Sequence, residues 1–201
     1  MMTIRRTAAL GALAAVGISG LWAETRFYTL DPTHSNAGFS VKHLMISNVR
    51  GNFSKLEGTA QWDPKDPTAA QLHAVIDVSS VDTREPKRDA HLKSADFFDA
   101  AKYPQMKFES TKFETKTNQL LMTGNLTIRG VTKPVTFVVD GPSAPIKDPW
   151  GNVRLGASAT TRINRKDFGL SFNAAMDGGG VVVGDDVDIT LDVELVQKKG
   201  Q

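Results

Sequence analysis

The chain has 201 residues, of which 40% are hydrophobic and 23% are charged; this composition is ordinary for a globular protein and argues against disordered, collagen-like and membrane-embedded classes. Its 24 basic and 22 acidic residues give a formal net charge of +2, so we expect no nucleic acid as a partner, because such affinity comes largely from neutralised phosphates. The chain contains no cysteine, which excludes disulfides, thiol chemistry and zinc–thiolate sites.

The first 23 residues have the pattern of a secretory signal peptide. Arg5 and Arg6 precede an uncharged run from Ala8 to Trp22 that is rich in Ala, Gly and Leu. The run is short for a membrane-spanning helix, which needs about 20 residues; an uncleaved anchor is the alternative reading. We expect cleavage after Ala23, and both Sec and Tat export stay open because a lone arginine pair is weak evidence. Without the leader, 22 basic residues balance 22 acidic ones.

From Arg26 onward the hydrophobic residues recur with a period of two, which is typical of strands that have one wet face. In the clearest case, apolar residues alternate with acidic residues or threonine between Val187 and Leu195. Stretches of this kind are bounded by Gly, Pro, Asn or Asp. In chain order, the strand candidates are residues 37–43, 51–62, 71–80, 106–115, 120–130, 134–141, 153–163, 169–176 and 185–197.

Eight or more strands without recurring crossover helices predict an all-β fold and exclude a doubly wound parallel sheet. Alternation alone does not separate a sandwich from a barrel. Strands of about ten residues span roughly 33 Å, and long up-and-down strands favour a closed barrel, which removes exposed sheet edges. No repeat or linker divides the chain, so we expect one domain over residues 24–201.

Four histidines, His34, His43, His73 and His91, are the most obvious candidates for chemistry. None lies in an HExxH motif or a compact cluster with carboxylates. The chain also lacks the GxSxG, Walker and GxGxxG motifs. We therefore expect no catalytic residues, no metal and no cofactor, and a hydrogen-bonded structural role is the simpler interpretation of each histidine.

His43 ends a stretch in which Ala37, Phe39 and Val41 share one strand face. Two interpretations fit this position. His43 is either a hydrogen-bonded residue at a barrel rim or a polar contact to a ligand that lies inside.

A helix is predicted over about residues 94–102, capping one end of the barrel. Ser94 is a candidate N-cap, Asp96 lies in the first turn and Pro104 provides the stop. Phe97 and Phe98 would then cover an apolar opening.

The ten residues before this segment, 84–93, carry five basic or imidazole groups and only two acids. One interpretation is a solvated loop beside a helix that seals the barrel. The other is a cationic rim suited to an anionic head group.

A set of longer blocks runs in order through nearly all of the chain after the leader: "DPTHSNAGFSVKHL", "NVRGNF", "SSVDT", "RDAHLKSADFFDAAKYP", "FEST", "GNLTIRGVTKPV" and "INRKDFG". Read together, these blocks resemble the YceI-like family of bacterial periplasmic proteins. The resemblance implies an extended, eight-stranded, lipocalin-like antiparallel barrel in the periplasm. It also implies that the interior binds a long-chain isoprenoid, such as a prenyl diphosphate or a prenylated quinone.

Small inner residues such as Gly124, Ala157 and Ala159 are expected to leave room for such a chain. The expected ligand-binding residues are His34, Phe39, Val41, His43, Met45, Phe53, Arg88, His91, Leu92, Phe97, Phe98, Phe108, Leu126, Ile128 and Phe137.

Three classes of function remain at this point. The first is a binding or carrier protein that shields an isoprenoid or similar amphiphile from water. The second is an enzyme acting on such a lipid, with His43, His34 or His91 as base. The third is a stress-related interaction module beside a membrane redox partner. A homodimer is compatible with each, and no transmembrane segment is expected in the mature chain.

Overall fold

The structure is a computed structural model, and it describes residues 25–174 and 180–198. The expected signal peptide, residues 1–23, lies outside the described residues. No helix within the described ranges is long and apolar enough to cross a membrane.

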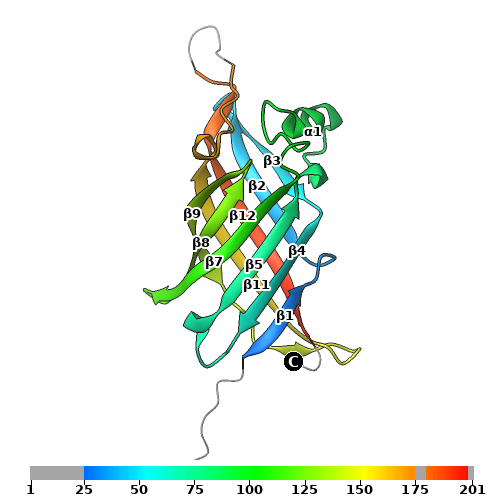
Figure 1. The fold of residues 1–201 in the computed structure, drawn as a ribbon, viewed down its shortest axis with the longest axis vertical. Coiled ribbons are helices and arrows are strands. Elements are labelled where there is room, and N and C mark those ends of the chain that lie inside the picture. The colour runs from blue at the N-terminus through cyan, green and yellow to red at the C-terminus, as the bar shows by residue number, and fades with distance from the viewer. Residues whose placement is uncertain (1–24, 175–179, 199–201) are drawn as a thin grey trace, which may run out of the picture.

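Within these ranges, twelve strands form one antiparallel sheet that closes into a barrel (Figure 1). The strands are β1 (Arg26–Leu30), β2 (Asn36–His43), β3 (Ser47–Phe53), β4 (Leu56–Trp62), β5 (Gln71–Asp77), β6 (Val81–Asp82), β7 (Gln105–Lys116), β8 (Gln119–Ile128), β9 (Val131–Asp140), β10 (Ile146–Lys147), β11 (Val153–Asn164) and β12 (Val183–Gln197). Short 3-10 helices are η1 (Pro67–Ala69), η2 (Val78–Ser80) and η3 (Arg165–Phe168), and the α-helix is α1 (Pro86–Lys93).

The ring has eight positions, in the order β11-β9-β8-β7-β5-β4-β1-β12, and β12 closes it by pairing with β11. The long strand β12 pairs with β2 along its first part and with β1 at its end, so β1 and β2 share one position in the wall. The β11–β12 ladder runs unbroken from Arg154↔Val196 to Asn164↔Asp186. The predicted eight-stranded, lipocalin-like barrel is therefore confirmed, and the sandwich is excluded.

The predicted strand over residues 169–176 is wrong in its described part, because Gly169–Ala174 has no strand structure. Gly169 ends η3 in the left-handed conformation (φ 76°). The Asn173 side chain then takes the place of a strand partner, since it donates to the Val183 carbonyl at 2.8 Å and accepts from the backbone of Val182 and Val183. Residues 175 and 176 lie outside the described ranges.

The short helix is present, but its predicted range of 94–102 is wrong. Helix α1 begins at Pro86, which needs no N–H partner in a first turn, and the Glu85 side chain caps it by accepting from the Lys87 amide. Ser94, predicted as the N-cap, is the C-cap, and its amide donates to the His91 carbonyl. The residues that follow form turns, with Asp99 at φ 51°.

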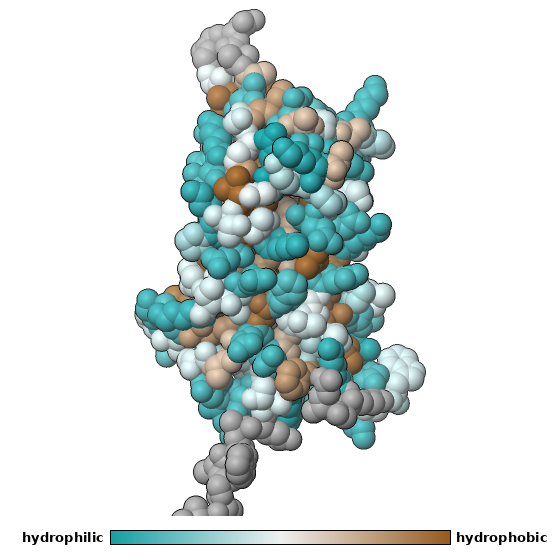
Figure 2. All heavy atoms as spheres, viewed as in Figure 1, coloured by the Kyte–Doolittle hydropathy of each residue, from teal (hydrophilic) through white to brown (hydrophobic). Residues whose placement is uncertain are grey.

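We call residues 86–103 the lid segment and the barrel end that carries it the upper end, at the top of Figure 1. Two apolar clusters fill parts of the barrel. The larger one includes Phe53, Met106, Phe137 and Phe168, and the partly buried Phe98 of the lid segment packs against it. The smaller cluster comprises Tyr28, Ala60, Leu155 and Leu195. It lies at the lower end, where β1 meets the end of β12. The outer face in Figure 2 is mostly hydrophilic.

Candidate ligand cavity

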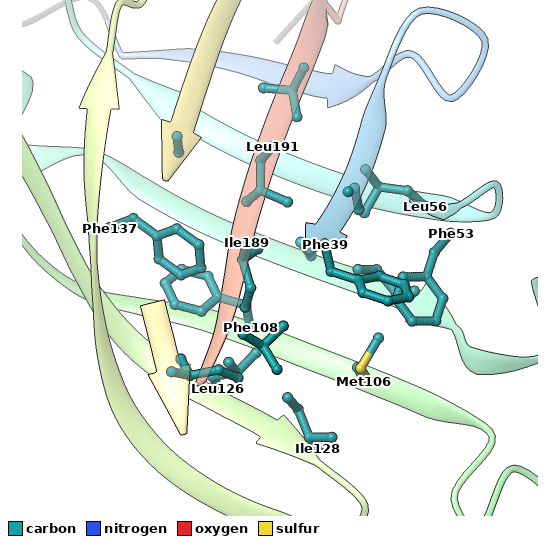
Figure 3. Close-up of a pocket in the computed structure, with 18 of the residues that line it drawn as sticks. Phe39, Phe53, Leu56, Met106, Phe108, Leu126, Ile128, Phe137, Ile189 and Leu191 are labelled. Atoms are coloured by element: carbon teal, nitrogen blue, oxygen red, sulfur yellow. The ribbon is translucent and has the colours of Figure 1, made fainter. Parts of the chain in front are cut away.

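A cavity of about 460 Å³ runs inside the barrel, and apolar side chains form almost all of its lining. This volume lies within the usual range for ligand pockets, roughly 300–1,000 Å³. Figure 3 shows side chains from many strands converging on it, including Phe39 from β2, Met106 from β7, Phe137 from β9 and Ile189 from β12. The arrangement follows from the period of two, which turns every second side chain of each strand inward.

Aromatic rings define the middle of the cavity. The Phe39 and Phe53 ring centroids are 5.7 Å apart, and Phe108 meets Phe137 edge-on at 5.3 Å. Phe98 of the lid segment lies edge-on to Phe53 at 5.8 Å, so the lid contributes directly to the lining.

Two glycines make room for these rings. A Cβ atom at Gly51 would lie 2.5 Å from the Phe39 ring, and one at Gly124 would lie 2.4 Å from the Phe108 ring. Each ring therefore lies against bare backbone of the wall. Gly124 does not line the cavity itself, because the Phe108 ring takes the space beside it; it leaves room for ligand only indirectly, by letting that ring lie against the wall. Ala157 and Ala159 do line the cavity, as expected.

Basic and imidazole groups line the upper end of the cavity. Arg88 donates from Nε to the Thr83 hydroxyl and from Nη2 to the Thr83 carbonyl, both at 2.8 Å. No carboxylate in the described ranges forms an ion pair with it, and its side chain lies at the cavity. The hydrogen-bond acceptors of its guanidinium are thus neutral groups, and the positive charge lies next to the apolar surface of the cavity.

His91 and His43 lie at the same end as Arg88. The His91 Nε2 atom is 2.9 Å from Asp96 Oδ2, and its ring packs edge-on against Phe97 at 5.0 Å and Phe172 at 4.8 Å. These contacts fix the imidazole between the lid segment and the chain after η3. His43 is half-buried at the end of β2 and lines the cavity.

Arg165 is the one fully buried arginine of the described chain, with 4% exposure. Its Nε donates to the Gly184 carbonyl at 2.8 Å, Nη1 donates to the Leu170 carbonyl, and Nη2 lies 3.3 Å from both the Val183 carbonyl and Asp185 Oδ1. Burial lowers the pKa of its guanidinium. These bonds tie η3 to the start of β12 and use the guanidinium as a structural tether at the upper end.

The lower end carries a polar cluster around Arg154. Its guanidinium lies 2.7 Å from Asp31 Oδ2 and 2.7 Å from Asp148 Oδ2, and it also pairs with Glu194. Hydrogen bonds from the Thr33 hydroxyl and then from Arg154 hold the pKa of Asp31 well below its ordinary value. Burial alone would raise the pKa of Asp148, but hydrogen bonds from Arg154 and Asn152 lower it well below its ordinary range.

His34 belongs to this lower cluster, because its Nδ1 is 3.0 Å from Asp31 Oδ2. The ligating atoms of Asp31, His34 and Glu194 lie within 4.8 Å of one another, but the Arg154 guanidinium already contacts both carboxylates. This positive charge makes the cluster an ion-pair network of the barrel rim and a poor place for a cation.

All the expected ligand-binding residues except His34 and Met45 line the cavity. His34 lies outside because it belongs to the turn that connects β1 and β2. Met45 lies in the β2–β3 turn in a left-handed conformation (φ 60°) and is 55% exposed. Both residues lie in turns outside β2, where the alternation of inward and outward side chains no longer applies. Neither side chain therefore points into the barrel.

Several lining residues were not among those expected. Met106, Met122, Ile189, Leu191 and Leu195 line the cavity, and the alternation of their strands is the signal that places them inward. Phe168, Leu170 and Phe172 also line it; they recur at every second position, but the segment after β11 that carries them is not a strand.

The three histidines proposed as bases do not form one site. His34 lies beside Glu194 through their common partners Asp31 and Arg154, whereas His43 pairs with Val183. These two residues of β12 are eleven positions apart, which corresponds to roughly 36 Å of strand.

Comparisons with known proteins agree with this architecture. The sequence model of the YceI-like domain matches residues 28–195. Protein YceI of Escherichia coli O157:H7 is 40% identical over 170 residues, which cover 83% of this chain and 83% of that protein. The crystal structure of Burkholderia cenocepacia BcnA superposes with a TM-score of 0.71 at 25% identity, covering 82% of this chain and 98% of the other.

A third similar structure is a polyisoprenoid binding domain from Saccharophagus degradans, implicated in plant cell wall breakdown. It superposes with a TM-score of 0.61 at 18% identity and covers 85% of this chain and 98% of that domain. At this identity the likeness shows a common barrel fold.

Proposed function

Because the chain belongs to the YceI-like family, we propose that it is a binding and carrier protein for a long-chain isoprenoid or a similar amphiphile, of the prenyl diphosphate or prenylated quinone type. The observation that carries this proposal is the cavity of about 460 Å³ inside the barrel with its almost wholly apolar lining. A cavity of this kind suits a linear hydrocarbon chain and offers little to a polar solute.

The driving force for binding comes from the tail. Each CH₂ group removed from water contributes about 0.8 kcal/mol, and the cost of ordering the chain reduces the total. The similar barrel of Saccharophagus degradans is described as a polyisoprenoid binding domain, and this supports the same ligand class here.

The head group is proposed to lie at the upper end, beside Arg88, His91 and His43. Arg88 brings a positive charge without a carboxylate partner in the described chain, so it suits a phosphate or a quinone carbonyl oxygen. Among the residues that line the cavity, we assign the ligand contacts to Phe39, Val41, His43, Phe53, Arg88, His91, Leu92, Phe97, Phe98, Phe108, Leu126, Ile128 and Phe137.

The location is part of the proposal. Residues 1–23 are proposed to direct export to the periplasm, and residues 24–201 to form a single mature domain. No catalytic residue, metal or cofactor is assigned, and the interaction-module alternative has no specific observation in its favour.

The test is to purify the protein from the periplasm, extract it with organic solvent and identify the extract by mass spectrometry. We expect an isoprenoid or similar amphiphile in near-stoichiometric amount. Recovery of no amphiphile from folded, monodisperse protein would contradict the proposal.

A pair of variants makes this test sharper. Ala157→Phe places a ring in the cavity, since Ala157 is part of its lining, and is expected to reduce the extracted lipid severalfold. Thr160→Phe is the control, because Thr160 lies on the same strand with its side chain exposed, and it should retain the wild-type amount.

A further inference from the structure

One incomplete seam of the barrel wall lies between β9 and β11; the β3–β6 boundary, which has two register pairs, is another. These strands share only the register pairs Ser158↔Asp140, Ala159↔Val139 and Thr160↔Val138. On its other side, β9 pairs with β8 along its length, from Val139 to Val131. Strand β11 likewise pairs with β12 as far as Asn164. Above Thr160, the two fully described strands therefore face each other without a ladder.

The chemistry of the seam keeps it open. Pro134 of β9 has no N–H to donate, and proline in a sheet is confined to edges and irregular positions. One hydrogen bond is found across the upper seam, from the Thr161 hydroxyl to the Thr136 carbonyl at 2.8 Å. An outer groove follows this line, and residues 133–136 and 161–164 form most of its lining, together with Asp167 and Phe168.

Side chains separate this groove from the cavity. Ile163 and Phe168 line both the outer groove and the inner cavity. Phe168 is only 2% exposed and belongs to η3, which ends in the left-handed Gly169. Groove and cavity therefore share these two side chains, and no register pair joins the strands above Thr160.

Contacts at both ends of the barrel oppose opening there. At the upper end, Arg129 donates to the carbonyls of Gly169 and Ala95 and so joins the β8–β9 turn to the lid segment and to the chain after η3. At the lower end, the buried cluster around Tyr28 and Leu155 packs inside the barrel next to the ion pairs of Arg154. Opening either end would break charge-assisted hydrogen bonds or expose core, which costs more than moving two side chains.

We propose that the β9–β11 seam is the entrance through which the apolar chain of the ligand passes into and out of the barrel. This inference rests on the proposed lipid-binding function and adds a route to it. Ile163 and Phe168 are the gate, and the Thr161–Thr136 hydrogen bond is the latch that must open. The barrel ends then stay closed during exchange.

Cross-linking through introduced cysteines tests the route. Because the chain has no native cysteine, the reagent can react only with the introduced thiols. Continuing the β9–β11 register by two residues places Thr136 opposite Arg162, so the double variant Thr136→Cys/Arg162→Cys is closed with a short bifunctional thiol reagent. The control is Thr127→Cys/Thr132→Cys, which joins β8 to β9 where the hydroxyls are already 2.8 Å apart. The probe is cis-parinaric acid, a long polyene whose fluorescence rises on burial, in full-length mature protein.

We expect the seam cross-link to slow both uptake and release of the probe by about tenfold or more, as gated access does, with little change in equilibrium affinity. The control cross-link should leave both rates unchanged, and Phe168→Leu should speed both. Unchanged rates after complete seam cross-linking would overturn the side entrance while leaving lipid binding intact. Failure of uncross-linked wild-type protein to bind the probe and to retain any amphiphile would overturn the carrier function and the entrance together.

Discussion

Gly51 and Gly124 each lie under a phenylalanine ring, and these two contacts decide how much of the barrel axis stays free. The Phe39 and Phe108 rings are large enough to cross the cavity, yet each rests against backbone where a side chain would otherwise stand. A barrel of this strand number is either filled by side chains or holds one small ligand. The glycines favour the second outcome.

We predict that Gly124→Ala destabilises the protein by about 1–3 kcal/mol, the usual cost of overpacking a core. The new Cβ would lie 2.4 Å from the Phe108 ring and 2.5 Å from the Glu109 carbonyl oxygen, so the ring must move toward the cavity axis. Urea denaturation measures the loss, and the amount of extracted lipid should fall with it.

Gly156→Ala is the control for this variant, because its Cβ would meet only the Val193 carbonyl oxygen at an ordinary 3.7 Å. Equal stability of the two alanine variants would show that Phe108 does not depend on the space at Gly124.

At the scale of elements, the sequence predicted most strands and misplaced the helix. Ser94 and Pro104 suggested a helix over 94–102, but Glu85 and Pro86 are the stronger start signals, and they place α1 at Pro86–Lys93. Phe97 is nevertheless buried, with 7% exposure, because the turns that follow α1 fold back over the barrel. Burial of the aromatic residues was predictable from their type. The backbone conformation that places them over the barrel was not.

The lid segment is fastened by Arg129, and we predict that Arg129→Met loosens it selectively. This change removes the donors to the carbonyls of Ala95 and Gly169 but keeps a long unbranched side chain. Amide hydrogen exchange of residues 94–103 should become roughly tenfold faster, as expected for local opening, while the barrel strands keep wild-type protection.

Arg162→Met is the matched control, because Arg162 pairs with Asp188 at 2.6 Å on the exposed surface between β11 and β12. An even rise in exchange over the whole barrel after Arg129→Met would point to global destabilisation and would contradict a local clamp.

For the molecule as a whole, alternation along the strands was enough to predict an all-β fold with an apolar interior, since inward residues can be read from a period of two. The choice of a barrel rested on the length of the strands and on the family resemblance. The cavity's upper wall was not predictable in the same way, because Phe168 and Phe172 follow β11 in an irregular segment. The incomplete β9–β11 seam has one sequence signal, Pro134, which marks β9 as a partial edge. Strands β9 and β11 meet only through tertiary pairing, and the extent of that pairing depends on their register. No local sequence pattern predicts this register.

The ion pairs at the lower end give the whole barrel a predictable response to acid. A carboxyl whose pKa is lower in the folded chain than in the unfolded chain stabilises the fold above its unfolded pKa, and this stabilisation is lost as the pH falls toward the folded pKa. The pKa values of Asp31 and Asp148 are both lowered in this way. We therefore expect the midpoint temperature of unfolding to fall steadily below about pH 4, near the ordinary pKa of aspartate.

Arg154→Met tests the origin of this dependence, because Arg154 contacts both carboxylates. The variant should be less stable than wild type at pH 7, and its midpoint temperature should change less between pH 7 and about pH 2, since the pKa of each aspartate returns toward its ordinary range. Lys87→Met, an exposed change at the opposite end of the barrel, should follow the wild-type curve. If Arg154→Met runs parallel to wild type across this pH range, the acid response arises elsewhere. The other carboxyls whose pKa is lowered, at Asp66, Asp77, Glu114 and Asp188, then become the groups that control it.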